Sequence, residues 1–167
     1  MRAFLPTVSA LMVAATTLVC QVGAEESKVP LDKLPKAVVE SIKKKFPTAE
    51  LVEETEEKED GKVEYEVTVK VAGKKIDVTV EANGKIEGYE KEIGVGELPA
   101  AVIATLDKTY PKATKKLAEA VYEVEDGKDE LEFYEIQLET ADKKTVEAKV
   151  KADGTLVKDK DKEEEKK

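Results

Sequence analysis

The chain has 167 residues and a net charge of −9, with a single cysteine and no histidine or tryptophan. This composition excludes a Cys/His zinc site and the nucleophilic triads that need histidine. The negative charge argues against a nucleic-acid partner, which requires clustered positive charge. Paired carboxylates could support glycoside hydrolysis, but with 5% aromatic residues the chain offers no evident sugar cleft. We therefore expect no enzymatic activity and no cofactor.

The first 24 residues have the three-part layout of a secretory signal peptide. Arg2 is the only charge among them, residues 11–22 are mostly apolar, and Ala24 ends a short run of small residues. We expect cleavage after Ala24, export to the periplasm or beyond the cell, and no membrane association afterwards. Two alternatives stay open. The segment approaches the length of a membrane anchor, and Cys20 could carry a lipid, although a valine precedes it where a lipobox has a small residue.

One sequence unit occurs twice, at an offset of 64 to 70 residues. The differences in offset place the insertions between elements, where loops tolerate them. A repeat of this kind predicts two copies of one structural unit. The matching segments are 34–39 with 98–103, 46–47 with 110–111, 65–67 with 134–136, and 83–84 with 153–154. The predicted organisation is signal peptide 1–24, repeat 1 at 29–93, repeat 2 at 94–158 and a disordered charged tail at 159–167.

Each repeat is predicted to open with an amphipathic helix. Pro35 and Pro99 suit the first turn, where a missing N–H costs nothing, and Pro47 and Pro111 end the helices. Apolar residues recur at the spacing of one helix face, which is far more often core than a partner site. They are Leu34, Val38, Val39, Ile42 and Phe46 in repeat 1, and Leu98, Val102, Ile103, Leu106 and Tyr110 in repeat 2.

Alternating apolar and polar residues then predict antiparallel strands with one buried and one wet face. Charged segments at 49–58 and 113–125 are interpreted as edge strands, protected from unwanted pairing by their charge. Each repeat is thus one helix on a roughly four-stranded antiparallel sheet, which makes the fold α+β with one sheet face left open. The residues expected to face the helices are Val67, Val69, Val78, Val80, Ile136 and Leu138.

Glycines mark the predicted turns between these strands. A two-residue type II′ turn that begins at Gly73 would pair Val71 with Ile76. A three-residue turn that ends at Gly84 would pair Val80 with Ile86 and keep the apolar residues on one face. The second repeat has the same three-residue pattern at 152–154.

These motifs together resemble the PepSY-like family, which is described as beta-lactamase-inhibitor-like. The resemblance rests on Leu-Pro-x-Ala-Val, the Phe-Pro or Tyr-Pro helix end, the Tyr-Glu-Val strand and the Asn-Gly or Asp-Gly turn, and it spans about residues 30–158. It implies a bacterial exported protein without known catalysis. It also implies a fold like that of beta-lactamase inhibitor proteins, whose sheet face grips an enzyme. Residues 25–167 lack the cysteines of those inhibitors, so their specific target does not carry over.

Two acidic runs invite a metal-site interpretation. Converging carboxylates suit divalent cations, but neither run has the Asp-x-Asp-x-Asp-Gly geometry of a calcium loop. We interpret both runs as solvated, edge-protecting charge, and expect no metal ligands and no metal dependence. The first run is Glu53, Glu54, Glu56, Glu57, Glu59 and Asp60, and the second is Glu123, Glu125, Asp126, Asp129 and Glu130.

The open sheet face is the predicted partner-binding surface of a monomer. Phe133 precedes an apolar-row tyrosine, so it is expected on the wet face, either as an aromatic anchor or as a cover over a gap between the repeats. The first functional hypothesis is a protein-binding module, an inhibitor or regulator of a peptidase or other envelope hydrolase. The alternative is a low-affinity binder of cations or envelope polymers. The residues expected around Phe133 are Glu64, Glu66, Thr68, Glu135 and Gln137.

Overall fold

The computed structural model describes residues 25–28, 30–59 and 62–157. The predicted signal peptide, the predicted tail and Asp60 of the first acidic run lie outside these residues. In chain order the elements are β1 (Glu25–Lys28), η1 (Leu31–Lys33), α1 (Lys36–Lys45), β2 (Glu50–Glu59), β3 (Lys62–Val71), β4 (Lys74–Glu81), β5 (Ile86–Ile93), η2 (Val95–Glu97), α2 (Ala100–Thr109), β6 (Thr114–Glu125), β7 (Lys128–Glu139) and β8 (Thr145–Val150).

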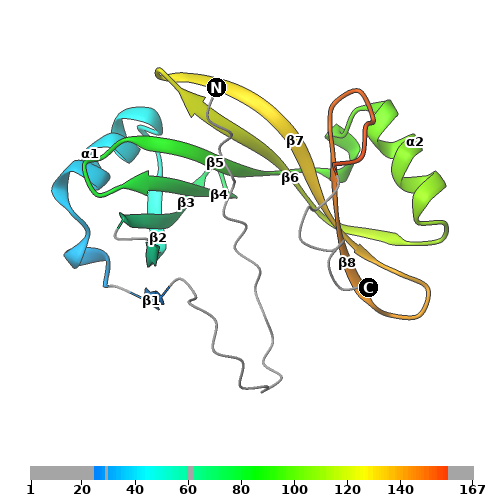
Figure 1. Cartoon of the computed structure of the whole chain (residues 1–167), viewed down its shortest axis with the longest axis horizontal. Helices are drawn as coiled ribbons and strands as arrows, with labels where there is room; N and C mark the ends of the chain where they lie inside the picture. Colours follow the sequence, from blue (N-terminus) through cyan, green and yellow to red (C-terminus); the bar gives the residue numbers. More distant parts are fainter. Residues whose placement is uncertain (1–24, 29, 60–61, 158–167) are drawn as a thin grey trace.

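Within the described residues, the strands form one continuous antiparallel sheet of eight strands, and each strand pairs with the next one in the chain (Figure 1). The α+β class is confirmed, but the picture of two separate four-stranded sheets is wrong. β5 of the first repeat pairs directly with β6 of the second, with Tyr89 opposite Tyr122. After α2 the second repeat adds only β6, β7 and β8.

The two charged segments are not edge strands in this sheet. β2 lies between β1 and β3, and β6 lies between β5 and β7. The reason is visible in β6, where small buried residues, Ala118 and Ala120, alternate with Glu119. The charges project to one face of the sheet, so they leave the hydrogen-bonding edges of the strand free to pair.

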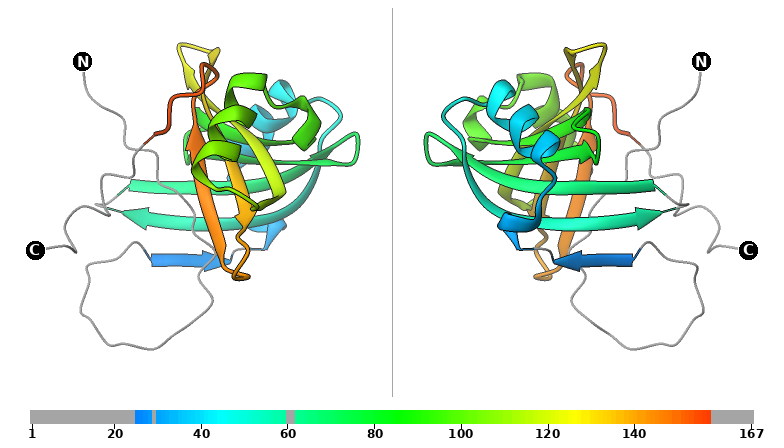
Figure 2. Two further views of the ribbon diagram at one scale, coloured as in Figure 1. Left: turned by 90° about the vertical axis from the view of Figure 1, so that its right-hand side faces the viewer. Right: turned by 90° about the vertical axis from the view of Figure 1, so that its left-hand side faces the viewer.

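Both helices cover the same face of the sheet, α1 over its first half and α2 over its second (Figures 1 and 2). Along β6, Tyr122 and Val124 pack against the core beneath α1, and Ala118 belongs to the core beneath α2. Residues an even number apart share a strand face, so the two cores lie on one side. The predicted inward-facing set is confirmed, because Val67, Val69, Val78, Val80, Ile136 and Leu138 are all at most 1% exposed.

The first hairpin turn differs from the predicted one. Ala72 and Gly73 form the turn, with φ of 52° and 84°. Positive φ at both positions is the type I′ arrangement, which matches the twist of the flanking strands. Val69 therefore pairs with Ile76, two residues from the predicted register. Because the shift is an even number of residues, every side chain stays on its predicted face.

The three-residue turns are confirmed in both repeats. Gly84 and Gly154 have φ of 89° and 88°, and Val80 pairs with Ile86 as predicted. Both turns also press against a helix. A Cβ at Gly84 would lie 2.6 Å from the carbonyl oxygen of Ala37, and one at Gly154 would lie 2.9 Å from that of Ala101. At both turns glycine is thus needed twice over, because it adopts the left-handed backbone conformation and lets the turn pack closely against the helix.

The β6–β7 hairpin ties the second repeat to α1 of the first. Tyr122 stacks on Tyr89 with ring centroids 4.7 Å apart. Asp129 forms an ion pair with Lys45 and accepts a hydrogen bond of 3.1 Å from the Tyr89 hydroxyl. Part of the second acidic run therefore fixes the junction between the repeats, where the sequence predicted solvated charge. Lys45 also lies 5.0 Å from the centroid of the Tyr89 ring.

Substituting Gly88 with alanine is expected to destabilise the protein by about 1–3 kcal/mol, because it overfills the junction between β5 and β6. A Cβ at Gly88 would lie 2.7 Å from the backbone oxygen of Tyr122. Gly96→Ala is the matched control, since a Cβ at Gly96 would meet nothing within 4 Å. Urea unfolding of both variants measures the difference. Equal stabilities would contradict the close β5–β6 pairing.

Candidate functional site

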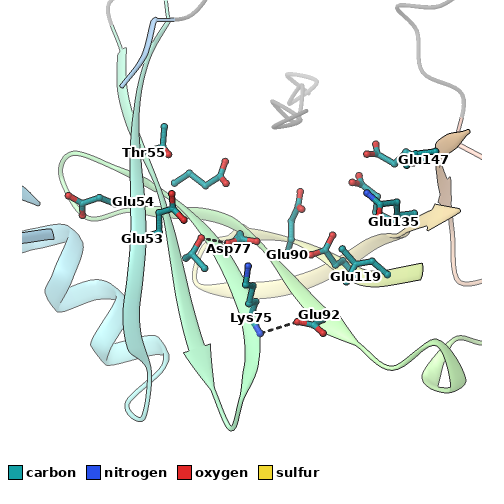
Figure 3. A pocket seen from close by; sticks show the side chains of 15 residues that line it. Glu53, Glu54, Thr55, Lys75, Asp77, Glu90, Glu92, Glu119, Glu135 and Glu147 are labelled. Carbon is teal, nitrogen blue, oxygen red and sulfur yellow. Dashed lines mark hydrogen bonds between the residues drawn. The ribbon is translucent and has the colours of Figure 1, made fainter. Parts of the chain in front are cut away.

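The sheet face opposite the helices is hollowed and strongly acidic. A hollow of about 780 Å³ lies over β2 to β8, and Figure 3 shows its acidic side chains. Among the described residues, nine acidic residues line it, and Lys75 is its single basic lining residue. We call this surface the acidic hollow. Its lining residues are Glu53, Glu54, Thr55, Glu66, Thr68, Lys75, Asp77, Glu90, Glu92, Leu117, Glu119, Glu135, Gln137, Thr145 and Glu147.

The strand register brings like charges into direct opposition across the centre of the acidic hollow. Asp77 pairs with Glu90, and Glu119 pairs with both Glu92 and Glu135. Like charges at paired positions destabilise a sheet. A row of opposed carboxylates therefore lowers the stability of the folded protein. Charged groups held in such unfavourable surroundings are common at functional sites.

Three carboxylates meet most closely, those of Glu90, Glu119 and Glu135. One oxygen from each lies within 4.8 Å of the others. We call these three residues the carboxylate cluster. Burial, and then the negative charge of surrounding carboxylates, raises the pKa of each of the three to about 7. Lys149 offsets part of this rise in the pKa of Glu90 and Glu135. The cluster therefore changes its charge near neutral pH, well above the usual range of a glutamate.

Glu135 is the most enclosed member of the carboxylate cluster, with 9% of the residue exposed. Its Oε2 atom is buried and accepts no hydrogen bond from any residue that the structure describes. The Lys149 ammonium faces this atom, with an Nζ–Oε2 distance of 3.5 Å. That distance exceeds the usual 2.7–3.2 Å of an N–H···O hydrogen bond. Lys149 also lies 3.9 Å from Glu147 and 5.6 Å from the centroid of the Phe133 ring.

Four of the predicted partner-binding residues line the acidic hollow: Glu66, Thr68, Glu135 and Gln137. Thr68 donates a hydrogen bond of 2.5 Å to Asp77. Glu64 lies outside the lining, near the start of β3, where it pairs with Glu81. The sequence thus correctly placed these four residues on the sheet face opposite the helices, and whether they bind a partner stays a prediction.

The expectation that Phe133 is exposed is wrong. Phe133 lies on the face of the acidic hollow, as its position predicted, but only 6% of it is exposed. It pairs with Val121, which is 7% exposed, and Lys149 lies over its ring. This geometry suits the alternative of Phe133 as packing near the repeat junction.

The first acidic run is not simply solvated. Glu53 and Glu54 both belong to the lining of the acidic hollow, but Figure 3 shows the Glu54 carboxylate directed away from the centre of the hollow. Glu54 is 3% exposed, and neither of its carboxylate oxygens accepts a hydrogen bond. Burial, with a smaller contribution from Asp32, raises the pKa of Glu54. The run thus divides between the two faces of β2.

Most of the acidic hollow, including Glu90, Glu92 and Glu119, was not predicted from the sequence. The sequence nevertheless contains a weak signal for these three residues. Glu90 and Glu92 alternate with Tyr89 and Lys91 in β5, and Glu119 lies between two buried alanines. Period-two alternation could have placed them on the open face. It could not have shown that they meet, because β5–β6 pairing joins the two repeats.

The family sequence pattern described as "Putative beta-lactamase-inhibitor-like, PepSY-like" matches the chain twice, at residues 21–88 and 84–158. The chain belongs to the PepSY-like family. The two tandem copies predicted from the sequence are thereby confirmed. Among the described residues, no helix is long and apolar enough to cross a membrane. No curated protein matches this PepSY-like chain.

Several solved structures share the fold of this PepSY-like protein. A BLIP-like protein from Bacteroides fragilis is 19% identical, with a TM-score of 0.56 over 74% of this chain and 82% of its own. A protein from Bacteroides eggerthii, titled "putative periplasmic", is 15% identical, with a TM-score of 0.60 over 74% and 86%. A DUF2874 family protein from Bacteroides ovatus is 16% identical, with a TM-score of 0.58 over 76% and 86%. At these identities the likeness shows the fold alone.

Proposed function

We propose that this PepSY-like protein is an exported, non-catalytic binding module that holds a basic surface of a partner protein in its acidic hollow. The observation that carries the proposal is the lining of the hollow, nine acidic residues against one lysine. The descriptions of the family and of the Bacteroides eggerthii protein support a periplasmic inhibitor or regulator of an envelope hydrolase. The chain has no histidine, and its one cysteine is Cys20, which supports a role without catalysis.

Charge complementarity is the physical basis of this binding. A concave acidic surface with protein walls concentrates a negative potential and speeds the approach of a positive partner. Lysine or arginine side chains that enter the acidic hollow would also relieve the repulsion between opposed carboxylates such as Glu92 and Glu119. Because Phe133 is buried, the acidic side chains of the hollow, and not an aromatic anchor, make the main contact with the partner.

Charge reversal in the acidic hollow tests this function. The double variant Glu66→Lys, Glu92→Lys is expected to weaken binding by at least about tenfold, because like charges then face the partner. The partner is first captured from an envelope fraction and identified, and its affinity is then measured by calorimetry in the presence of a chelator. The expected affinity of the unmodified protein falls as salt rises.

A matched double reversal on the helix side provides the control. Glu40 on α1 and Asp107 on α2 have side chains that are 66% and 63% exposed. Glu40→Lys, Asp107→Lys changes the net charge by the same amount and is expected to leave binding within about twofold. Equal losses from the two double variants would show a general charge effect and contradict a site in the acidic hollow.

A second function, cation binding, is favoured by one specific observation. The three oxygens of the carboxylate cluster converge within 4.8 Å, as the ligands of a single divalent ion do.

A further inference from the structure

We propose that the carboxylate cluster of Glu90, Glu119 and Glu135 is a binding site for one divalent cation of the calcium type. The site is independent of any protein partner. The sequence predicts no metal ligands, because neither acidic run has the geometry of a calcium loop. The cluster instead takes one residue from each of three neighbouring strands, β5, β6 and β7.

The spacing of the ligand atoms suits such an ion. Calcium binds oxygens at about 2.3–2.6 Å, so two oxygens on opposite sides of one ion lie about 4.6–5.2 Å apart. The three cluster oxygens lie within 4.8 Å of one another. One ion can therefore contact all three carboxylates while the strands keep their pairing. The oxygen-only ligand set suits calcium, magnesium or manganese over softer metals.

The environment of Glu135 is a second, independent reason to expect that a cation binds here. This residue is nine-tenths buried, and its Oε2 atom accepts no hydrogen bond. A buried carboxylate without donors is costly. The Lys149 ammonium, 3.5 Å away, attracts Oε2 without donating a hydrogen bond to it. Figure 3 shows Glu135 and Glu119 on neighbouring strands beside Glu90, at the inner surface of the acidic hollow.

Lys149 does not prevent the ion from binding. With all three carboxylates ionised, the cluster and Lys149 together carry a charge of −2, which one divalent ion neutralises. Lys149 keeps its contacts with Glu147 and with the Phe133 ring when the ion takes the Glu135 oxygen. Calcium takes six to eight oxygens, and the opening of the hollow to solvent leaves water to complete its coordination.

Calorimetric titration of the purified protein with calcium chloride alone tests the site. We expect saturable binding of one ion per chain, with a Kd on the order of 10⁻⁴ M, as in extracellular calcium modules. Glu119→Gln removes one ligand charge and is expected to weaken binding by at least about tenfold. Thermal melting checks that this variant folds, and it is expected to be at least as stable as the unmodified protein because one repulsive charge is gone.

Glu66→Gln is the matched control, because it removes the same charge from the acidic hollow but lies outside the carboxylate cluster. Its calcium affinity is expected to stay within about threefold of the unmodified protein. A heat of calcium binding that does not saturate would show diffuse attraction and overturn the proposal. An equal loss of calcium affinity in Glu119→Gln and Glu66→Gln would do the same. Neither result would affect partner binding, which is measured with a chelator present.

Discussion

Val69→Asp is expected to destabilise the protein by about 3–5 kcal/mol, because it places an unpaired charge in the core beneath α1. Val69 is 0% exposed and packs in that core with Val38 and Ile42. Natural domains have a total stability of about 5–15 kcal/mol, so this one substitution removes a large share of it. Urea unfolding followed by circular dichroism measures the loss.

Val52→Asp is the control, since it makes the same chemical change where the valine is 41% exposed. Its cost is expected to be about 0.5 kcal/mol or less. Thr68, next to Val69, would be a poor control because its hydroxyl donates a hydrogen bond to Asp77 in the acidic hollow. If Val52→Asp were as costly as Val69→Asp, the assignment of faces in the sheet would be refuted.

Stability is expected to fall as pH rises from about 4.5 to about 7. Folding raises the pKa of Glu90, Glu119 and Glu135 from 4.5 to about 7. In this window the folded state holds more protons than the unfolded state, so raising the pH favours unfolding. One such proton gives a slope of about 1.4 kcal/mol per pH unit. Glu90 and Glu119 are only partly buried, so solvent screening reduces their contribution below this slope. We expect a summed loss of at least about 2 kcal/mol in the free energy of unfolding, measured by urea unfolding between pH 5 and 7.5.

Surface acids act in the other direction and in another pH range. Hydrogen bonds and nearby lysines lower the pKa of Glu97 and Glu139. Their contribution is present above the usual glutamate pKa and is lost as pH falls below it. The variant Glu119→Gln isolates the effect of the carboxylate cluster, because it should flatten the fall between pH 5 and 7.5 without changing the acid limb. A fall of unchanged steepness in this variant would place the titration outside the cluster.

Local pattern was sufficient for the parts of the fold that depend on strand face and turn chemistry. Alternation with a period of two placed Val67 and Val69 toward the helix and Glu66 and Thr68 toward the opposite face. The hairpin register was wrong by two residues, yet the faces survived because two is the period of a strand. The glycine at the end of each three-residue turn was likewise predictable, since Gly84 needs a positive φ that other residues rarely adopt.

The tertiary structure alone decided which strands meet, because pairing partners are chosen by contacts far apart in the sequence. Nothing local indicated that β5 of one repeat would pair with β6 of the next. That pairing joins the strands of the two repeats into one sheet and brings Glu90 close to Glu119 and Glu135. Each of these glutamates, read singly, is an ordinary polar residue on the wet side of a strand. Burial in the folded sheet, and then the negative charge of nearby carboxylates, raises the pKa of each of the three. Both causes exist only when the strands have assembled and brought the three carboxylates within 4.8 Å.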